Sequence, residues 1–295
     1  MGRRTTNMLV EVALFATMIF MSPAISEANL FVFGDSLYDS GMSLYSGVEG
    51  VGAAYFPYGL RHYLDQPAGR YSDGFIIPDF LARRVGLPLL QPFLAPGIKN
   101  YSQGINFASA RACVPVENCF EAMNWKAQLG YFVEMVQDLK QQVGKIEAKR
   151  LLSKAGYLFN IGEDDYVNHI RNLPHLFQQD SYIKQRLGNL TILIKTIYKE
   201  GGRKFAFQNI GPLGCMPSIK YALGYNGTCA PEAQELAKLH NAAFAALAKR
   251  LETTLPGFKY SLFDFYTTLY KHILHGDAYG TYVTFPLFDL IYFIA

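Results

Sequence analysis

Ser36 is the residue in this sequence whose setting most favours nucleophilic chemistry. It follows Gly34 and Asp35, and it comes directly after a short apolar run at residues 29–33. Such a run predicts a buried parallel strand that ends in a loop, so the serine hydroxyl and its backbone N–H would face a cleft. A serine hydroxyl becomes a strong nucleophile when a neighbouring base takes its proton. The tripeptide Gly-Asp-Ser is common, so by itself it does not decide the function.

A second polar cluster follows a second apolar run. Residues 156–161 predict another buried strand, and the turn after it contains Glu163, Asp164 and Asp165. Open α/β sheets bind ligands at the carboxyl ends of their strands. The sequence therefore predicts that Ser36 and these carboxyl groups lie at the same edge of one sheet.

Strand-like and helix-like segments alternate through the rest of the chain. Helices are predicted near residues 78–85, 128–143, 183–197, 231–255 and 265–274, and further strands at 204–209 and 260–263. Long loops rich in Gly, Pro and Tyr are expected between residues 45 and 103. The alternation predicts a single α/β domain in which helices cover both faces of a mainly parallel sheet.

The first 28 residues have the pattern of a secretory signal peptide. Arg3 and Arg4 precede an apolar stretch that ends at Pro23, and small residues suited to cleavage follow. The stretch is too short to cross a bilayer. We therefore expect a secreted, extracellular protein, located in the apoplast or cell wall. The alternative is a buried N-terminal helix.

Export would explain the pattern of cysteines and glycosylation motifs. The cysteines are Cys113, Cys119, Cys215 and Cys229, and the Asn-x-Ser/Thr motifs begin at Asn100, Asn189 and Asn226. In an oxidising compartment the two close pairs favour disulfides 113–119 and 215–229, although two other connectivities are possible. The three asparagines are candidate N-glycosylation sites. No Cys-x-x-Cys spacing occurs and no histidine lies near the cysteines, which argues against a zinc site.

The composition argues against several other classes of function. The net charge is +3 over 295 residues, and basic residues occur only in short patches without interleaved aromatic residues. We therefore expect no nucleic-acid binding. Half of the residues are hydrophobic, which is enough to form a large core. We expect a monomer without a metal or cofactor.

Four longer segments resemble the conserved blocks of the plant GDSL esterase/lipases, which belong to the SGNH hydrolase superfamily. They are residues 31–41, 100–110, 157–166 and 204–217. The resemblance extends over roughly residues 30–280 and is greatest to the secreted, defence-associated members. It implies a three-layer α/β/α sandwich of the flavodoxin-like type and the hydrolysis of carboxylic esters in acyl or lipid substrates.

The resemblance also implies roles for three residues. Ser36 would be the nucleophile and would offer its N–H to the oxyanion, and Gly104 would offer a second N–H. Asp164 stands where the family has an asparagine whose side-chain amide is the third donor. An ionised aspartate only accepts hydrogen bonds, and losing one such donor raises the barrier by roughly 3–4 kcal/mol. Asp164 could donate in its protonated form if burial or the adjacent Asp165 raised its pKa.

The general base that the resemblance implies is not found in this sequence. The family has a histidine in a late Asp-x-x-His segment, and none of the six histidines stands three residues after an aspartate. They are His62, His169, His175, His240, His272 and His275. A substitute base at His272 or His275 would have a spacing that matches nothing in the family.

The resemblance fades near residue 280, and residues 281–295 form an almost wholly apolar tail. We therefore expect a hydrolase domain at residues 29–280 that is C-terminally truncated and impaired in turnover. The alternatives are a catalytically inactive binding protein and a truncated splice product.

Overall fold

The computed structural model describes residues 29–47, 52–56, 58–59, 68–98, 100–114, 124–172 and 179–279. The strands are β1 (Leu30–Gly34), β2 (Gly104–Asn106), β3 (Gly156–Asn160), β4 (Lys204–Gln208) and β5 (Lys259–Phe263). The α-helices are α2 (Ile77–Arg84), α3 (Trp125–Val143), α4 (Lys145–Lys154), α5 (Glu163–Asn172), α6 (Gln179–Glu200), α7 (Pro217–Leu223), α8 (Pro231–Thr254) and α9 (Phe265–Leu274). Short 3-10 helices are η2 (Met42–Tyr45), η3 (Leu213–Cys215) and η4 (Gly276–Tyr279). The predicted signal peptide and the apolar tail lie outside the described residues.

The five strands form one parallel sheet in the order β2-β1-β3-β4-β5. This is the flavodoxin-like order, in which the direction of winding reverses between β1 and β3. Such folds bind ligands outside the carboxyl ends of the strands at that reversal. Ser36 follows β1 and Asp164 follows β3, so both predicted site residues flank this position.

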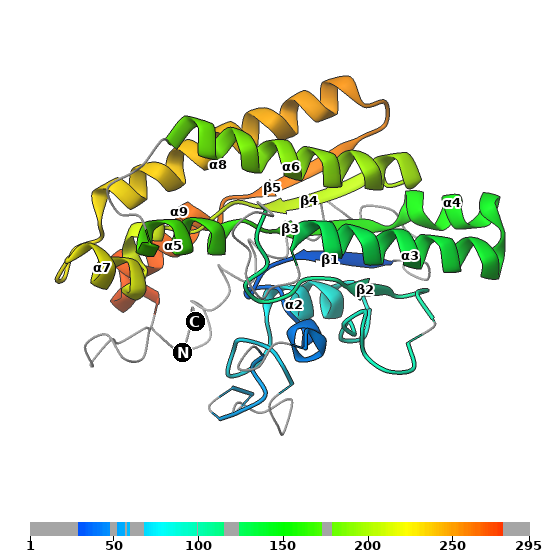
Figure 1. Ribbon diagram of the computed structural model, residues 1–295, viewed down its shortest axis with the longest axis horizontal. Coiled ribbons are helices and arrows are strands. Elements are labelled where there is room, and N and C mark those ends of the chain that lie inside the picture. The colour runs from blue at the N-terminus through cyan, green and yellow to red at the C-terminus, as the bar shows by residue number, and fades with distance from the viewer. Residues whose placement is uncertain are drawn as a thin grey trace.

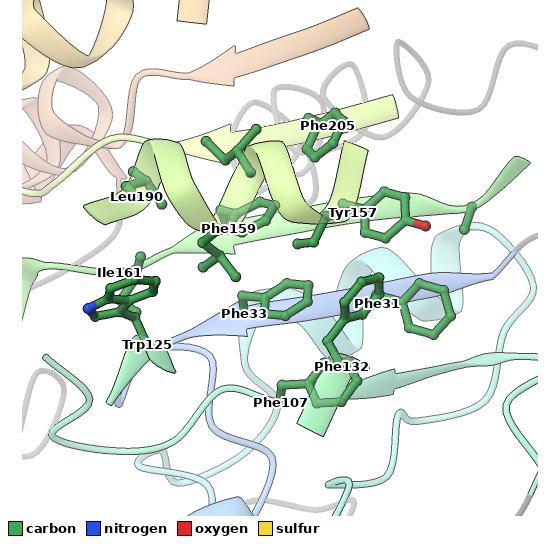
Figure 2. Close-up of a cluster of buried hydrophobic side chains, with 14 of the residues drawn as sticks. Phe31, Phe33, Phe107, Trp125, Phe132, Tyr157, Phe159, Ile161, Leu190 and Phe205 are labelled. Atoms are coloured by element: carbon green, nitrogen blue, oxygen red, sulfur yellow. The ribbon is translucent and has the colours of Figure 1, made fainter. Parts of the chain in front are cut away.

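A large aromatic core fills one face of the sheet (Figure 2). Phe33 of β1 stacks on Phe159 of β3 with ring centroids 4.9 Å apart, and Tyr157 stacks on Phe205 of β4 at 5.3 Å. Helices α3, α4, α6 and α8 contribute the residues that pack against these rings. Large buried aromatic side chains supply most of the hydrophobic stabilisation that holds helices on a sheet.

The opposite face carries a smaller core. Leu30, Val32 and Leu158 alternate with the aromatic residues along their strands and pack with Leu81 and Ala82 of α2. In Figure 1, α6 and α8 lie above the sheet and α2 lies below it. The three-layer α/β/α prediction is therefore confirmed, and the period of two along each strand explains why both faces are apolar.

Candidate active site

The end of β1 is fixed on both sides before the chain reaches Ser36. Gln128 of α3 accepts the Gly34 N–H at 3.1 Å and donates back to the Gly34 carbonyl at 2.8 Å. On the other side, the Asp35 N–H donates to the Asn160 carbonyl at 3.1 Å. A Cβ on Gly34 would lie 2.4 Å from that carbonyl oxygen, so only glycine fits. A rigid strand end therefore positions Ser36, which is half-buried.

The loop after Ser36 is tied to the loop that follows β2. The buried carboxylate of Asp39 accepts the N–H of Ala110 at 2.8 Å. The Ser109 N–H donates to the Gly34 carbonyl at 3.1 Å. The segment around Ser109 and Ala110 consequently lies beside the strand end that carries Ser36.

Arg111 follows in this segment and has an unusual backbone conformation. Its φ is +59°, and no other non-glycine residue in the described ranges has a positive φ. The left-handed region costs a non-glycine residue roughly 1–2 kcal/mol. The Arg111 backbone N–H hydrogen-bonds to Asp164, and the positive charge of the exposed Arg111 side chain also acts on this carboxyl group. Sequence reasoning missed Arg111, because nothing in Ser109-Ala110-Arg111-Ala112 marks a left-handed residue.

The structure contradicts the role predicted for Gly104. Its N–H donates to the Tyr101 carbonyl at 3.0 Å, and it pairs with Leu30 at the amino end of β1. Ser36 lies beyond the carboxyl end of the same strand, so the Gly104 N–H cannot reach an oxyanion there. A glycine is required at position 104 for packing, since a Cβ there would lie 2.0 Å from the Leu30 carbonyl oxygen. The backbone N–H that faces this site in its place is that of Arg111.

Four carboxyl groups gather at this edge of the sheet, and we call Asp35, Glu163, Asp164 and Asp165 the carboxyl cluster. Asp35 Oδ2 accepts the N–H groups of Gly162 and Glu163, each at 3.3 Å. These bonds join the segment that carries Ser36 to the first turn of α5. Carboxylates at a helix N-terminus are favoured by the helix dipole, but here Asp35, Glu163 and Asp165 are buried and Asp164 is half-buried.

Burial raises the pKa of every member of the carboxyl cluster. The pKa rises to about 7 for Glu163, to about 6 for Asp164 and to about 7 for Asp165. That of Asp35 rises well above its usual value, because of burial and then the charges of Asp164 and Glu163. Asp35 Oδ1, Glu163 Oε2 and Asp164 Oδ2 are buried, and none has a hydrogen-bond partner within the described ranges. Because an unpaired buried charge is costly, the cluster favours bound protons.

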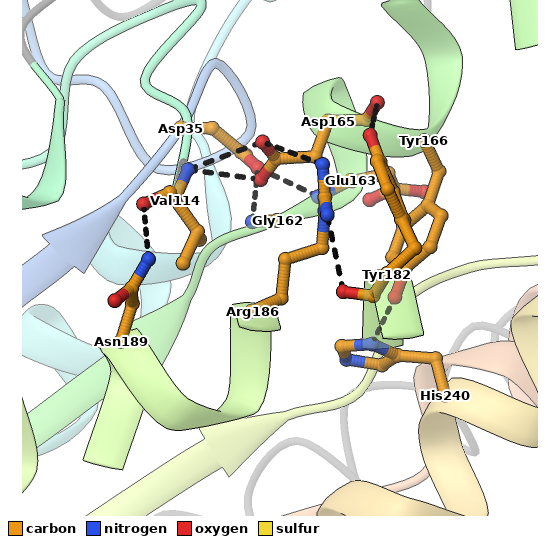
Figure 3. A network of polar contacts seen from close by, with 10 residues as sticks. All are labelled: Asp35, Val114, Gly162, Glu163, Asp165, Tyr166, Tyr182, Arg186, Asn189 and His240. Atoms are coloured by element: carbon orange, nitrogen blue, oxygen red, sulfur yellow. Dashed lines mark hydrogen bonds and ion pairs between the residues drawn. The ribbon is translucent and has the colours of Figure 1, made fainter. Parts of the chain in front are cut away.

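A network of polar contacts on α5 and α6 holds the loop that carries Arg111 (Figure 3). The Val114 N–H donates to both oxygens of Asp165, at 3.1 and 3.0 Å, and the Val114 carbonyl accepts from Asn189 Nδ2 at 3.1 Å. Arg186 lies 3.8 Å from Asp165 Oδ1 and stacks on the ring of Tyr182. Both backbone polar groups of Val114 are thus hydrogen-bonded to side chains from two helices.

Comparison with known proteins identifies the family. The family model of GDSL-like lipases/acylhydrolases matches residues 30–283. The chain belongs to the GDSL lipase family. It is 38% identical to a GDSL lipase of Tanacetum cinerariifolium, over 86% of this chain and 68% of that protein. It is also 38% identical to GDSL esterase/lipase 2 of Arabidopsis thaliana, over 86% of this chain and 70% of that protein.

One relative differs from the others in its name. The chain is 36% identical to inactive GDSL esterase/lipase-like protein 25 of Arabidopsis thaliana, over 90% of this chain and 62% of that protein. The GDSL lipase family is named for hydrolysis, but one of these relatives is named as inactive.

Four of the six histidines of this GDSL lipase family member are described, and none is hydrogen-bonded to Ser36. His240 is buried and bonds through Nδ1 to the Tyr166 hydroxyl at 2.7 Å. Burial and the nearby Arg186 lower the pKa of His240 to about 3, so it stays neutral. His272 contacts the Thr268 carbonyl at 2.6 Å through Nδ1.

The remaining two described histidines also make their contacts away from Ser36. His169 packs against the ring of Tyr182 with centroids 4.2 Å apart, and His275 caps the C-terminus of α9. His62 and His175 lie outside the described residues. Within the described ranges, the Ser36 hydroxyl accordingly has no hydrogen bond to a histidine.

The predicted disulfides and glycosylation sites have different outcomes. Cys215 and Cys229 form a disulfide with an S–S distance of 2.07 Å, so that pairing is confirmed. Cys113 is also in a disulfide, but its predicted partner Cys119 lies outside the described residues. Asn100 and Asn226 are exposed.

Asn189 is poorly suited to glycosylation in the folded chain. It lies within α6 and its amide nitrogen, the atom that a glycan would modify, already donates to Val114. A glycan attached there would disturb the hydrogen bond to the Val114 carbonyl. The motif alone carries no information on this contact.

Neither a metal centre nor a membrane span emerges from the part of the chain that the structure describes. No group of three or more His, Cys, Asp or Glu side chains there could hold a metal ion. None of the helices in the same ranges is both long enough and apolar enough to cross a bilayer.

Proposed function

We propose that this chain is a serine-dependent carboxylic-ester hydrolase in which Ser36 is the nucleophile and turnover is low. The observation that carries the proposal is the position of Ser36. It follows β1 beside the reversal point of a flavodoxin-like sheet, the place where such folds bind ligands. The ester carbonyl would be attacked by Ser36 Oγ, and negative charge would develop on the carbonyl oxygen.

Asp164 would control whether that negative charge is stabilised. As a carboxylate, Asp164 accepts the Arg111 N–H and so occupies a backbone donor beside Ser36. As a neutral acid, it would keep its carbonyl oxygen toward Arg111 and donate its O–H to the substrate oxygen. Since burial raises the pKa of Asp164 to about 6, the donating form grows as the pH falls through about 6.

Low turnover is proposed because, within the described residues, no histidine is hydrogen-bonded to Ser36. Loss of the triad histidine from a serine hydrolase lowers turnover by about 10⁶-fold. The oxyanion donors and substrate binding would then supply most of the catalysis that remains.

Labelling with a fluorophosphonate probe tests the nucleophile directly. We expect slow covalent labelling at Ser36, located by peptide mass spectrometry, and its loss in Ser36→Ala. Ser218→Ala, at an exposed serine on α7, is the matched control and should label like the wild type. Labelling at another residue, or equal labelling of Ser36→Ala, would show that Ser36 is not the nucleophile.

A second candidate function is binding without turnover. The specific observation that favours it is the contact between Asp164 and Arg111, which places an acceptor where an oxyanion needs donors. The similarity to a protein named as inactive points the same way. Hydrolysis of 4-nitrophenyl butyrate separates the two: a rate that is unchanged in Ser36→Ala favours binding alone.

We also propose that the chain is secreted, monomeric and glycosylated, and that it acts in plant defence. The N-terminal pattern of residues 1–28 and the Cys215–Cys229 disulfide support export to an oxidising compartment. Asn100 and Asn226 are the sites that we propose for glycans, because both are exposed. Treatment of the secreted protein with a glycosidase that releases N-linked glycans should reduce its mass, and no change would contradict glycosylation.

A further inference from the structure

Arg111 presents an exposed positive charge at the edge of the sheet that carries Ser36. No ion pair to it is formed within the described ranges. Burial raises the pKa values of Asp164 and Tyr71, and the charge of Arg111 partly offsets both rises. Asp164 lies in the first turn of α5, and Tyr71 belongs to the loops that precede α2. Ala110, the residue before Arg111, donates its N–H to Asp39, and the same carboxylate accepts the N–H groups of Met42 and Ser43. Arg111 therefore lies near both the carboxyl cluster and the segment at residues 42–47.

An exposed apolar surface extends from Tyr71 away from Arg111. The Tyr71 ring contacts Tyr58 with centroids 5.5 Å apart, and Tyr58 contacts Tyr55 at 5.3 Å. Tyr55 is 54% exposed and the adjacent Phe56 is 76% exposed. Groups of exposed apolar side chains on a soluble protein commonly mark binding sites.

Leu44 and Tyr45 lie next to this surface. The Tyr71 hydroxyl accepts the Gly52 N–H at 2.8 Å, and a Cβ on Gly52 would lie 2.7 Å from Leu44 Cδ2. Leu44 is 39% exposed and Tyr45 is 41% exposed. We call Leu44, Tyr45, Tyr55 and Phe56 the aromatic patch, and Tyr71 connects it to Arg111.

The charges around Arg111 leave it able to bind an anion. The acidic groups nearest to Arg111 are Asp164, on which its charge acts, and Asp39, which accepts the N–H of the preceding Ala110. Asp35, Glu163 and Asp165 adjoin Asp164 in the carboxyl cluster. Burial raises the pKa of each, so these acids are partly neutral at slightly acidic pH. The exposed guanidinium remains charged and offers two parallel N–H donors to a carboxylate.

We propose that Arg111 and the aromatic patch together form a binding site for a long-chain carboxylic acid, with the carboxylate on Arg111 and the alkyl chain on the patch. This goes beyond the proposed function, because such binding needs neither Ser36 nor a base. The same chemistry describes the acid that would leave after hydrolysis of an acyl ester. A ligand of this kind would hold the site in a product-bound state.

Calorimetric titration of the full chain with decanoate and decanol tests the proposal. The two ligands share the alkyl chain and differ in charge, so we expect decanoate to bind at least tenfold more tightly. Arg111→Gln should remove that difference, whereas Arg84→Gln, at an exposed arginine in the last turn of α2, should keep it. Phe56→Ser should weaken both ligands to a similar extent.

Arg111→Gly is the control for a folding defect in Arg111→Gln. Glycine adopts a φ of +59° without strain, so this variant should fold at least as well as the wild type and still lose the preference for decanoate. Equal binding of decanoate and decanol by the wild type would overturn the proposal. So would binding to phosphatidylcholine vesicles without binding to monomeric decanoate, which would make the patch a membrane-contacting surface.

The outcomes are separable from those of the proposed function. Ser36→Ala should bind decanoate like the wild type, because Ser36 is not part of the proposed contacts. A chain that labels at Ser36 but ignores decanoate would refute the binding site alone, and the reverse result would refute the hydrolase alone.

Discussion

The aromatic face of the sheet and the carboxyl edge are both buried, but they are built in opposite ways. On the aromatic face, rings from neighbouring strands stack at about 5 Å, for example Phe33 on Phe159 at 4.9 Å. At the carboxyl edge, carboxyl oxygens of Asp35, Glu163 and Asp164 are buried without hydrogen-bond partners in the described ranges. The aromatic face stabilises the fold. The carboxyl edge holds acidic groups whose burial destabilises their charged forms, and such groups are available for chemistry.

The largest effect is expected from the aromatic face. Phe33→Ala should lower the free energy of unfolding by about 3–5 kcal/mol, because it removes a fully buried ring and leaves a cavity. Urea unfolding monitored by circular dichroism measures this. Ile146→Ala is the matched control, since Ile146 is 90% exposed and should change stability by less than about 0.5 kcal/mol. A small effect of Phe33→Ala would contradict the role assigned to this core.

The next effect concerns the pH dependence of stability, which arises at the carboxyl edge. The folded-state pKa values of Glu163 and Asp165 are raised to about 7, so their protonated forms favour the folded state. This stability is complete below the unfolded pKa values near 4 and is lost as the pH rises to about 7. We expect the free energy of unfolding to fall by a few kcal/mol between pH 5 and pH 8.

His240 opposes this trend, because burial lowers its pKa to about 3 and stability is lost when the pH falls below its unfolded value near 6.5. Glu163→Gln is therefore the informative variant, since it removes one titrating acid and leaves His240 unchanged. It should flatten the decline between pH 5 and pH 8. An unchanged decline would mean that Glu163 does not titrate in this range.

A smaller effect on stability is expected when Asp164 is replaced by asparagine, which has nearly the same shape and no charge. Asp164→Asn should raise the free energy of unfolding at pH 8 by about 1–2 kcal/mol and change it little at pH 5. The amide oxygen can still accept the Arg111 N–H, so only the charge is removed. Thermal unfolding at the two pH values measures this, and equal shifts at both would argue against a titrating Asp164.

The smallest effect is expected at the hydrogen bonds of the Val114 backbone. Asn189→Ala should cost about 1 kcal/mol, because it removes one hydrogen bond to a backbone carbonyl. Hydrogen exchange should then increase in the segment that contains Val114. Thr196→Ala, at a hydroxyl on the exposed side of the same helix, is the control and should leave that segment unchanged.

The fold was predictable because its strands are apolar on both faces. β1, β3, β4 and β5 read as apolar runs that end at polar turns, and the helices α3, α6 and α8 show clear 3.6-residue periods. β2 was missed, since it has three residues and ends at Asn106, whose side chain bonds to the Tyr38 carbonyl at 2.7 Å. The short helices α4, α5 and α7 were missed as well, because their apolar residues are few.

The site was predictable only where it coincides with a strand end. Ser36 and Asp164 follow β1 and β3 directly, so their place at the carboxyl edge followed from the pattern. Gly104 was misplaced because register decides which end of the sheet a residue occupies, and the pairing with Leu30 puts it at the amino end. Arg111 could not be foreseen, since its backbone conformation is imposed by contacts of the loop.

The central claim is that Asp164 determines whether an oxyanion at Ser36 is stabilised. The most direct measurement is the rate of fluorophosphonate labelling at Ser36 from pH 5 to pH 8, in the wild type and in Asp164→Asn. Taking the ratio of the two rates cancels the pH dependence of the serine itself. The account predicts a ratio near one at pH 5 that rises to at most about 10² by pH 8 in favour of Asp164→Asn. A ratio that is independent of pH, or faster labelling of the wild type at pH 8, would contradict it.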